Sequence, residues 1–188
     1  EQRELDPSFR WEDVHALTAA AREDPARAAA ATSAVSAFRA KRKIEEHAEA
    51  KFRTLEDLFR LHAGEPVIVF TGSNVMARQI ATRFMVPCLL SHCAKRERRE
   101  YLEGFAAGRY PVLVANRVLD EGVDLPEVKT AVVLGGMSSG RQAIQRLGRV
   151  LRKGDGGRAT LYEVVTDKTS EVKRSRDRRR NEAYRKLK

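Results

Sequence analysis

The chain has 188 residues, of which 42 % are apolar, and its 36 Lys and Arg outnumber its 26 Asp and Glu to give a formal charge of +10. This apolar fraction is enough for a packed core and excludes a wholly disordered chain. The basic excess favours a polyanionic partner, nucleic acid before membrane, and no apolar run approaches the ~20 residues needed to span a bilayer.

The first residues and the cysteines bear on where the protein works. The sequence begins EQRE, without Met and without signal-peptide character, so we expect part of a longer intracellular protein, cytoplasmic in a prokaryote and nuclear in a eukaryote. The only cysteines are Cys88 and Cys93, with His92 beside them. Because a disulfide framework or a zinc site needs more ligands, we expect reduced thiols and no metal site.

Helical patterns occupy the first 63 residues. A helix begins at Pro25 and continues to about residue 50 with a thin apolar stripe made of Val35, Phe38 and Ile44. A helix of this kind buries little, so we expect 1–51 to be a helical extension that projects or packs on a partner domain, with a solvated surface as the alternative. Another helix is predicted to begin at Thr54 and to end at Gly64.

From residue 65 onward, short apolar runs alternate with amphipathic helices. Strands are predicted at residues 67–70, 87–90, 112–115, 131–134 and 159–165. Alternation of strand and helix with short connections predicts an α/β fold, a parallel sheet of at least five strands flanked by helices. Ligands of such sheets bind beyond the carboxyl ends of the strands. We assign 52–166 to this domain.

The last segment, 167–188, is predicted to be a basic tail that is helical at first and then frayed. Residues 171–188 contain nine Lys or Arg and three acids. This charge has two interpretations. The segment either keeps the protein soluble or contacts nucleic-acid phosphates, in which case affinity falls steeply with salt.

Residues 139–152 read SGRQAIQRLGRVLR and have no carboxylate among them. On a helix, Gln145, Arg149 and Arg152 lie at positions i, i+4 and i+7 and share one face. Guanidinium groups bind planar anions with two parallel hydrogen bonds. The stretch therefore predicts a phosphate site, on a nucleotide or on a nucleic-acid backbone, with a solvated basic helix as the alternative.

Two further candidate sites follow predicted strands. Ser73 and Asn74 lie between a strand and a helix, where free backbone N–H groups favour an anion, although they can equally serve as a helix cap. After the third strand the chain reads GVDLP. Gly122 there permits close approach of the backbone to a ligand, and Asp124 is suited to accept hydrogen bonds from ribose hydroxyls.

These motifs resemble those of superfamily 2 helicases. QRLGRVLR at 145–152 fits motif VI, residues 115–126 resemble motif V, and VIVFTGSN at 67–74 resembles motif IV. Their order and spacing are similar to the C-terminal RecA-like lobe of an XPB-like DNA helicase. The resemblance covers about 60 % of the chain and implies a RecA-like fold. It also implies that the helical extension 1–51 is a thumb-like insertion of the kind found in XPB-type enzymes.

The resemblance also implies roles. Arg149 and Arg152 would act as arginine fingers on the γ-phosphate of ATP, with Gln145 beside them. Gly122 and Asp124 would face the nucleotide. The nucleic-acid backbone would meet residues from three segments: Asn116, Ser73, Asn74 and Arg98. Arg98 has an intradomain ion pair as its alternative.

The chain contains no G-x-x-x-x-G-K-[ST] phosphate loop and no Asp-Glu box, that is, no Asp-Glu-x-His or Asp-Glu-x-Asp sequence; the pair Asp120-Glu121 is followed by Gly-Val and does not match it. We therefore expect Mg2+ and ATP to be bound mainly by a preceding helicase lobe, and this chain alone to hydrolyse no ATP. Expected partners are that lobe, DNA as a single strand or duplex junction, and a protein such as a nuclease or repair factor. The alternatives are a non-catalytic nucleic-acid or protein interaction module, or a lobe of a remodeller or restriction-type translocase.

Overall fold

The computed structural model describes residues 25–116, 128–135 and 159–180, and its contacts divide the chain into two units, Glu1–Ile44 and Glu45–Lys188. In the first unit lies most of helix α3, Pro25–Glu46. Val35 and Phe38 of the predicted stripe are half-buried, but Ile44 is 75 % exposed. The predicted limits of the three domains stay a prediction.

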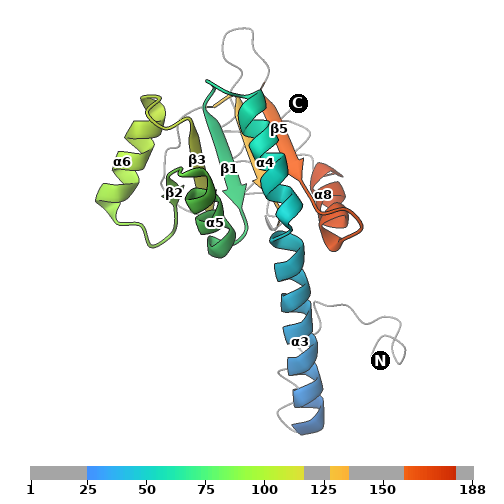
Figure 1. The fold of residues 1–188 in the computed structure, drawn as a ribbon. Helices are drawn as coiled ribbons and strands as arrows, with labels where there is room; N and C mark the ends of the chain where they lie inside the picture. Colours follow the sequence, from blue (N-terminus) through green and yellow to red (C-terminus); the bar gives the residue numbers. More distant parts are fainter. Residues whose placement is uncertain (1–24, 117–127, 136–158, 181–188) are drawn as a thin grey trace. The chain divides into compact units, whose positions relative to one another are not determined.

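The second unit is built on a five-stranded parallel sheet (Figure 1). Its strands are β1 Val67–Thr71, β2 Cys88–Leu89, β3 Val112–Asn116, β4 Thr130–Leu134 and β5 Thr160–Val164. They lie in the order β2-β3-β1-β4-β5, and every pair is parallel. The predicted parallel α/β fold is confirmed.

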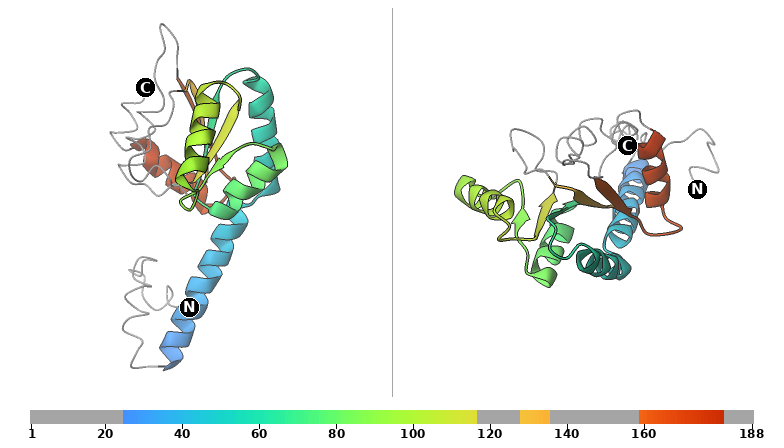
Figure 2. Two further views of the ribbon diagram at one scale, coloured as in Figure 1. Left: turned by 90° about the vertical axis from the view of Figure 1, so that its left-hand side faces the viewer. Right: turned by 90° about the horizontal axis from the view of Figure 1, so that it is seen from above.

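Helices cover both faces of this sheet. Helices α4, Glu49–Leu61, and α5, Asn74–Phe84, lie on one face, and α6, Lys95–Ala106, lies on the other (Figure 2). Successive strand residues serve opposite faces, as a pleated strand requires. Val67 and Val69 pack with the first pair of helices, whereas Ile68 and Phe70 pack with Phe105 of α6.

Helix α4 begins five residues earlier than the predicted start at Thr54. The additional turn exists because Phe52 packs into the core and Lys51 is buried in an ion pair. A lysine gives no apolar signal in the sequence, so the pattern did not predict this turn. Helix α8, Ser170–Arg180, follows β5. Among the helices of the described residues, none is both long and apolar enough to cross a membrane.

Leu55 and Leu61 of α4 provide a matched test of the core. Leu55 is fully buried, whereas Leu61 is 69 % exposed on the same helix. We expect Leu55→Ala to lower the free energy of unfolding by about 2–5 kcal/mol, because it leaves a cavity. The control Leu61→Ala should change it by at most about 0.5 kcal/mol. Urea unfolding followed by circular dichroism measures both, and equal losses would contradict the described packing.

Candidate functional site

Three strands of the sheet end side by side at its carboxyl edge. In the β1–β3 and β1–β4 registers, Thr71 is the partner of both Asn116 and Leu134. The segments that follow these three residues carry the motifs expected to bind ligands. The fold thus brings the starts of the three segments together, at the edge where parallel sheets bind their ligands.

Ser73 is the N-cap of α5. Its backbone is extended, with φ −134° and ψ 133°, and its side chain accepts a hydrogen bond from the backbone N–H of Met76 at 3.4 Å. Thr71 Oγ1 donates to the carbonyl oxygen of Ser73 at 3.0 Å and holds the turn. The capping role is therefore observed. It leaves open a second role toward a phosphate, because a helix start still offers further backbone N–H groups.

Asn116 and Asn74 join two of the segments. Asn116 is only 7 % exposed, and its Nδ2 donates to Oδ1 of the exposed Asn74. Within the described part of the chain, Oδ1 of Asn116 has no hydrogen-bond partner. A buried polar atom without a partner costs about 1–3 kcal/mol. Rotating both amides by 180° reverses this hydrogen bond and puts Nδ2 of Asn116 at the position without a partner. Nδ2 is a donor, and a phosphate oxygen is an acceptor.

Arg98 lies on α6, and its Nε is buried with no hydrogen-bond partner among the residues described. No carboxylate of that part of the chain lies within ion-pair distance of it. The neighbouring carboxylate of Glu97 accepts a hydrogen bond from the Tyr101 hydroxyl at 3.1 Å instead. Both predicted roles of Arg98, nucleic-acid contact and intradomain ion pair, stay predictions.

Five predicted site residues lie outside the described residues, and the structure tests none of their roles: Gly122, Asp124, Gln145, Arg149 and Arg152. What the structure places is the strand end before each group. Asn116 at the end of β3 precedes the first two, and Leu134 at the end of β4 precedes the other three.

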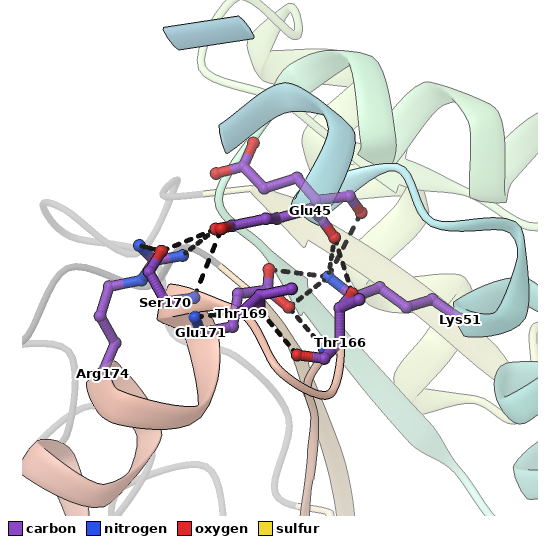
Figure 3. A network of polar contacts seen from close by, with 8 residues as sticks. Glu45, Lys51, Thr166, Thr169, Ser170, Glu171 and Arg174 are labelled. Carbon is purple, nitrogen blue, oxygen red and sulfur yellow. Dashed lines mark hydrogen bonds and ion pairs between the residues drawn. The ribbon is translucent and has the colours of Figure 1, made fainter. Parts of the chain in front are cut away.

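A buried polar network at the same edge was not predicted (Figure 3). Lys51 Nζ lies 2.7 Å from each carboxylate oxygen of Glu171, and their side chains are only 3 % and 1 % exposed. Lys51 also donates to the carbonyl oxygen of Glu45 at 2.7 Å, and Glu171 accepts from the backbone N–H of Thr166 at 2.8 Å. Both charges are therefore surrounded by partners.

Gly135, the residue after β4, fits directly against this ion pair. It has a φ of 45°, and a Cβ at this position would collide with Glu171 Oε1. Glycine permits both the left-handed backbone and the close approach. The pair therefore lies at the point where the chain leaves β4, and only the glycine was a signal of this in the sequence.

Burial and hydrogen bonds shift the pKa of two ionisable groups in this network, Lys51 and Glu45. Desolvation lowers the pKa of Lys51, against the opposing effect of Glu171. Burial acts to raise the pKa of Glu45, but hydrogen bonds from Ser170 and the charge of Arg174 outweigh it, so this pKa lies below its ordinary 4.5. Glu45 Oε2 accepts from Ser170 Oγ at 2.7 Å and from Arg174 Nη2 at 3.3 Å.

The cysteines are free thiols, as expected. Burial, with Cys93 nearby, raises the pKa of Cys88 to about 11, so its thiolate is scarce at neutral pH. Cys93 Sγ accepts from the backbone N–H of Leu90 at 3.2 Å. Within the described ranges, no group of three or more His, Cys, Asp or Glu side chains could hold a metal ion.

A sequence model described as the helicase conserved C-terminal domain matches residues 50–154. The chain belongs to this family. Its helicase C-terminal domain begins inside α4 and includes the whole described sheet up to β4. The expectation of a C-terminal lobe of an XPB-like superfamily 2 helicase is therefore confirmed.

Individual relatives agree with this helicase C-terminal domain. The DNA 3'-5' translocase XPB2 of Sulfurisphaera tokodaii is 38 % identical over 168 residues, which cover 89 % of this chain and 37 % of the relative. The DNA 3'-5' helicase XPB of Kineococcus radiotolerans is 37 % identical over 124 residues, 65 % of this chain and 22 % of the relative. The chain thus spans well under half of these curated relatives.

Solved structures agree on the fold. The C-terminal domain of the DEAD-box protein Dbp5 superposes with a TM-score of 0.57 at 22 % identity, over 69 % of this chain and 76 % of that one. At this identity the likeness shows the fold alone. It confirms the RecA-like architecture of the helicase C-terminal domain.

The buried ion pair yields a stability prediction. We expect Lys51→Met and Glu171→Met each to lower the free energy of unfolding by about 3–5 kcal/mol, because each leaves one buried charge without its partner. The double variant should be more stable than either single variant, since it buries no charge. Thermal and urea unfolding measure this.

The exposed pair Arg60–Glu56 on α4 is the control. Glu56→Ala should cost at most about 1 kcal/mol, because surface ion pairs are screened by water. Additive losses in the double variant Lys51→Met/Glu171→Met would contradict a buried, coupled pair.

Proposed function

We propose that this chain is the second motor lobe of an ATP-dependent DNA helicase or translocase of the XPB-like type. One observation carries the proposal: β1, β3 and β4 end at one edge, and the segments after them carry motifs IV, V and VI in that order. A sheet edge of this kind is where such folds bind nucleotides and other ligands. The names of the XPB relatives support DNA as the nucleic acid along which the motor moves.

The chemistry of the proposed motor centres on two arginines. When bound by a preceding lobe, ATP with Mg2+ supplies the phosphoryl group that is transferred to water. Arg149 and Arg152 of this lobe would hold the γ-phosphate and would neutralise the charge that develops on it. Gln145 orients the same phosphate or the attacking water. Gly122 and Asp124, from the segment after β3, would contact the nucleotide.

The described residues bear on the nucleic-acid side of the proposal. Asn116, Asn74 and the start of α5 lie together, and Asn116 and Asn74 are linked by a hydrogen bond. Backbone N–H groups and amide donors at a helix start suit phosphate oxygens. We propose that these residues hold one DNA strand while the two lobes open and close. Arg98 would contact the same strand from α6.

The setting of this motor is also a proposal. A relative from Drosophila melanogaster is named as the helicase/translocase subunit XPB of general transcription and DNA repair factor IIH. By similarity we propose a role in repair or transcription inside the cell, with a nuclease or repair factor as protein partner.

Turnover of ATP tests the motor. We expect the purified 188-residue chain to hydrolyse no ATP, because no phosphate loop or Asp-Glu box is present in its sequence. A longer form that includes an ATP-binding lobe should hydrolyse ATP in a DNA-stimulated reaction. In that form Arg149→Ala or Arg152→Ala should lower kcat by about 10³-fold, with DNA affinity unchanged.

Two outcomes would refute the motor. ATP turnover by the purified chain that Arg152→Ala abolishes would place the whole reaction in this lobe. A longer form that binds DNA but hydrolyses no ATP would favour a non-catalytic interaction module.

Substitution of Asn116 tests the DNA contact. We expect Asn116→Ala to weaken binding of the 188-residue chain to DNA by about tenfold for every sequence tried, because one hydrogen bond to the backbone is lost. Asn116→Thr keeps a donor and should bind nearly as well as the natural chain. Fluorescence anisotropy measures the affinity and melting temperature controls for folding. Equal affinity of all three forms would refute the contact.

A further inference from the structure

Helix α8 is rich in cations, with the sequence SEVKRSRDRRR. The sequence predicted only a basic tail. The structure shows a helix here, and its side chains divide into two faces. At about 100° per residue, Lys173, Arg176 and Arg180 fall within roughly 60° of one another. Glu171, Arg174 and Ser175 lie on the opposite side.

The inner face of α8 is bound to the rest of the lobe. Glu171 forms the buried ion pair with Lys51, and Arg174 Nη2 lies 3.3 Å from Glu45 Oε2 (Figure 3). One turn later Ser175 donates to Glu163 of β5. These contacts fix the helix on the domain, so its orientation does not depend on a ligand.

A second cation of α8, Arg179, also pairs with a carboxylate of the lobe. Arg179 Nε lies 3.3 Å from Glu163 Oε2, whose side chain is almost fully buried. The arginines that lean toward the lobe, Arg174 and Arg179, thus each have a carboxylate of the lobe to pair with.

On the outer face of α8, no carboxylate of the described residues pairs with a cation. Lys173, Arg176 and Arg180 are exposed, and none of them makes an ion pair or hydrogen bond within the described residues. The exposed carboxylate of α8, Asp177, lies at the margin of this face. Acids therefore neutralise the inward cations and leave three outward cations on a fixed helix.

The spacing of these cations suits a regular polyanion. Seven residues of helix separate Lys173 from Arg180, a length of about 10 Å. One strand of B-DNA carries a phosphate every ~3.4 Å along the axis, so this length spans about three phosphates. Because the backbone of the helix is already fixed, it does not have to be ordered on contact with such a surface, which favours binding.

The location of α8 agrees with this. Its first turn lies at the carboxyl ends of β4 and β5, because Thr166 and Gly135, which follow these strands, both contact Glu171. Asn116 and Ser73 lie at the same edge of the sheet. A nucleic acid bound at that edge would therefore lie on the same side of the domain as the first turn of α8.

We propose that Lys173, Arg176 and Arg180 of α8 form a second nucleic-acid contact, which binds the phosphate backbone of duplex DNA without regard to sequence. This surface lies outside the helicase motifs and goes beyond the proposed motor function. Lys51 and Glu171 are positioning residues for it, since they hold the first turn of the helix.

The salt dependence of DNA affinity tests the proposal. The triple variant Lys173→Ala/Arg176→Ala/Arg180→Ala of the 188-residue chain is compared with the natural chain on a duplex, between about 50 and 200 mM salt. Loss of three phosphate contacts should reduce the slope of log K against log salt by about 2.7. The natural chain should then lose roughly 40-fold more affinity over this range than the variant.

A matched control removes three exposed cations elsewhere. Arg53→Ala/Arg60→Ala/Lys129→Ala gives the same net charge and should leave the slope close to that of the natural chain. Asp177→Asn should strengthen binding at low salt, because it removes the carboxylate next to the surface. Arg176→Lys/Arg180→Lys should keep the slope, since the slope depends on the number of phosphates that cations neutralise, and Lys and Arg carry the same charge.

Three outcomes would overturn the proposal. Equal loss in the triple variant and the control would show that net charge alone acts. An unchanged slope in the triple variant would show no phosphate contact. Lost binding to an acidic peptide in the triple variant and in Arg176→Lys/Arg180→Lys, with DNA affinity unchanged, would identify a protein surface. None of these measurements involves ATP. Failure of the α8 proposal is therefore distinguishable from failure of the motor proposal, which is tested by ATP turnover.

Discussion

The buried ion pair between Lys51 and Glu171 is the interaction on which the arrangement of this domain depends. It joins residues that are 120 positions apart, in the first turn of α4 and the first turn of α8, and it does so at the carboxyl end of the sheet. Burying two charges costs several kcal/mol each unless they and their neighbours are fully hydrogen-bonded. Here Glu45, Thr166 and Gly135 provide the neighbours, so the pair fixes one geometry.

The middle of the sheet and its carboxyl edge differ in their chemistry. At the middle of the sheet, alternate residues of β1, β3 and β4 form two apolar clusters that need no particular partner beyond shape. At the carboxyl edge, polar side chains meet: Asn116 with Asn74, and Lys51 with Glu171. The apolar layers supply stability, and the polar edge determines where the segments that carry the motifs begin.

The sequence predicted the repetitive part of this fold well. Continuous apolar runs such as 67–70 and 112–115 became strands buried on both faces, because parallel strands covered by helices on both sides need apolar residues at every position. Ser73 followed from the chemistry of helix caps. These signals are local, so they can be read without knowing what lies nearby in space.

Long-range polar contacts could not be predicted in the same way. Lys51 looks like a surface residue of an early helix, and Glu171 like one acid in a basic tail, until the fold brings them together. The same holds for Asn116, whose buried Oδ1 has no hydrogen-bond partner in the described part of the chain. For Arg149 and Arg152, the motif predicts their roles. The structure describes the end of the preceding strand, β4, but the two arginines themselves lie outside the described residues.

The two borders of the sheet have a consequence for how this domain behaves at high concentration. An open sheet border offers unpaired backbone groups to a strand from another molecule, which starts aggregation. In the described sheet, one border is β2, which is only two residues long, and the other is β5, Thr160–Val164. Because β2 offers few unpaired backbone groups, strand addition at that border, and self-association through it, is disfavoured.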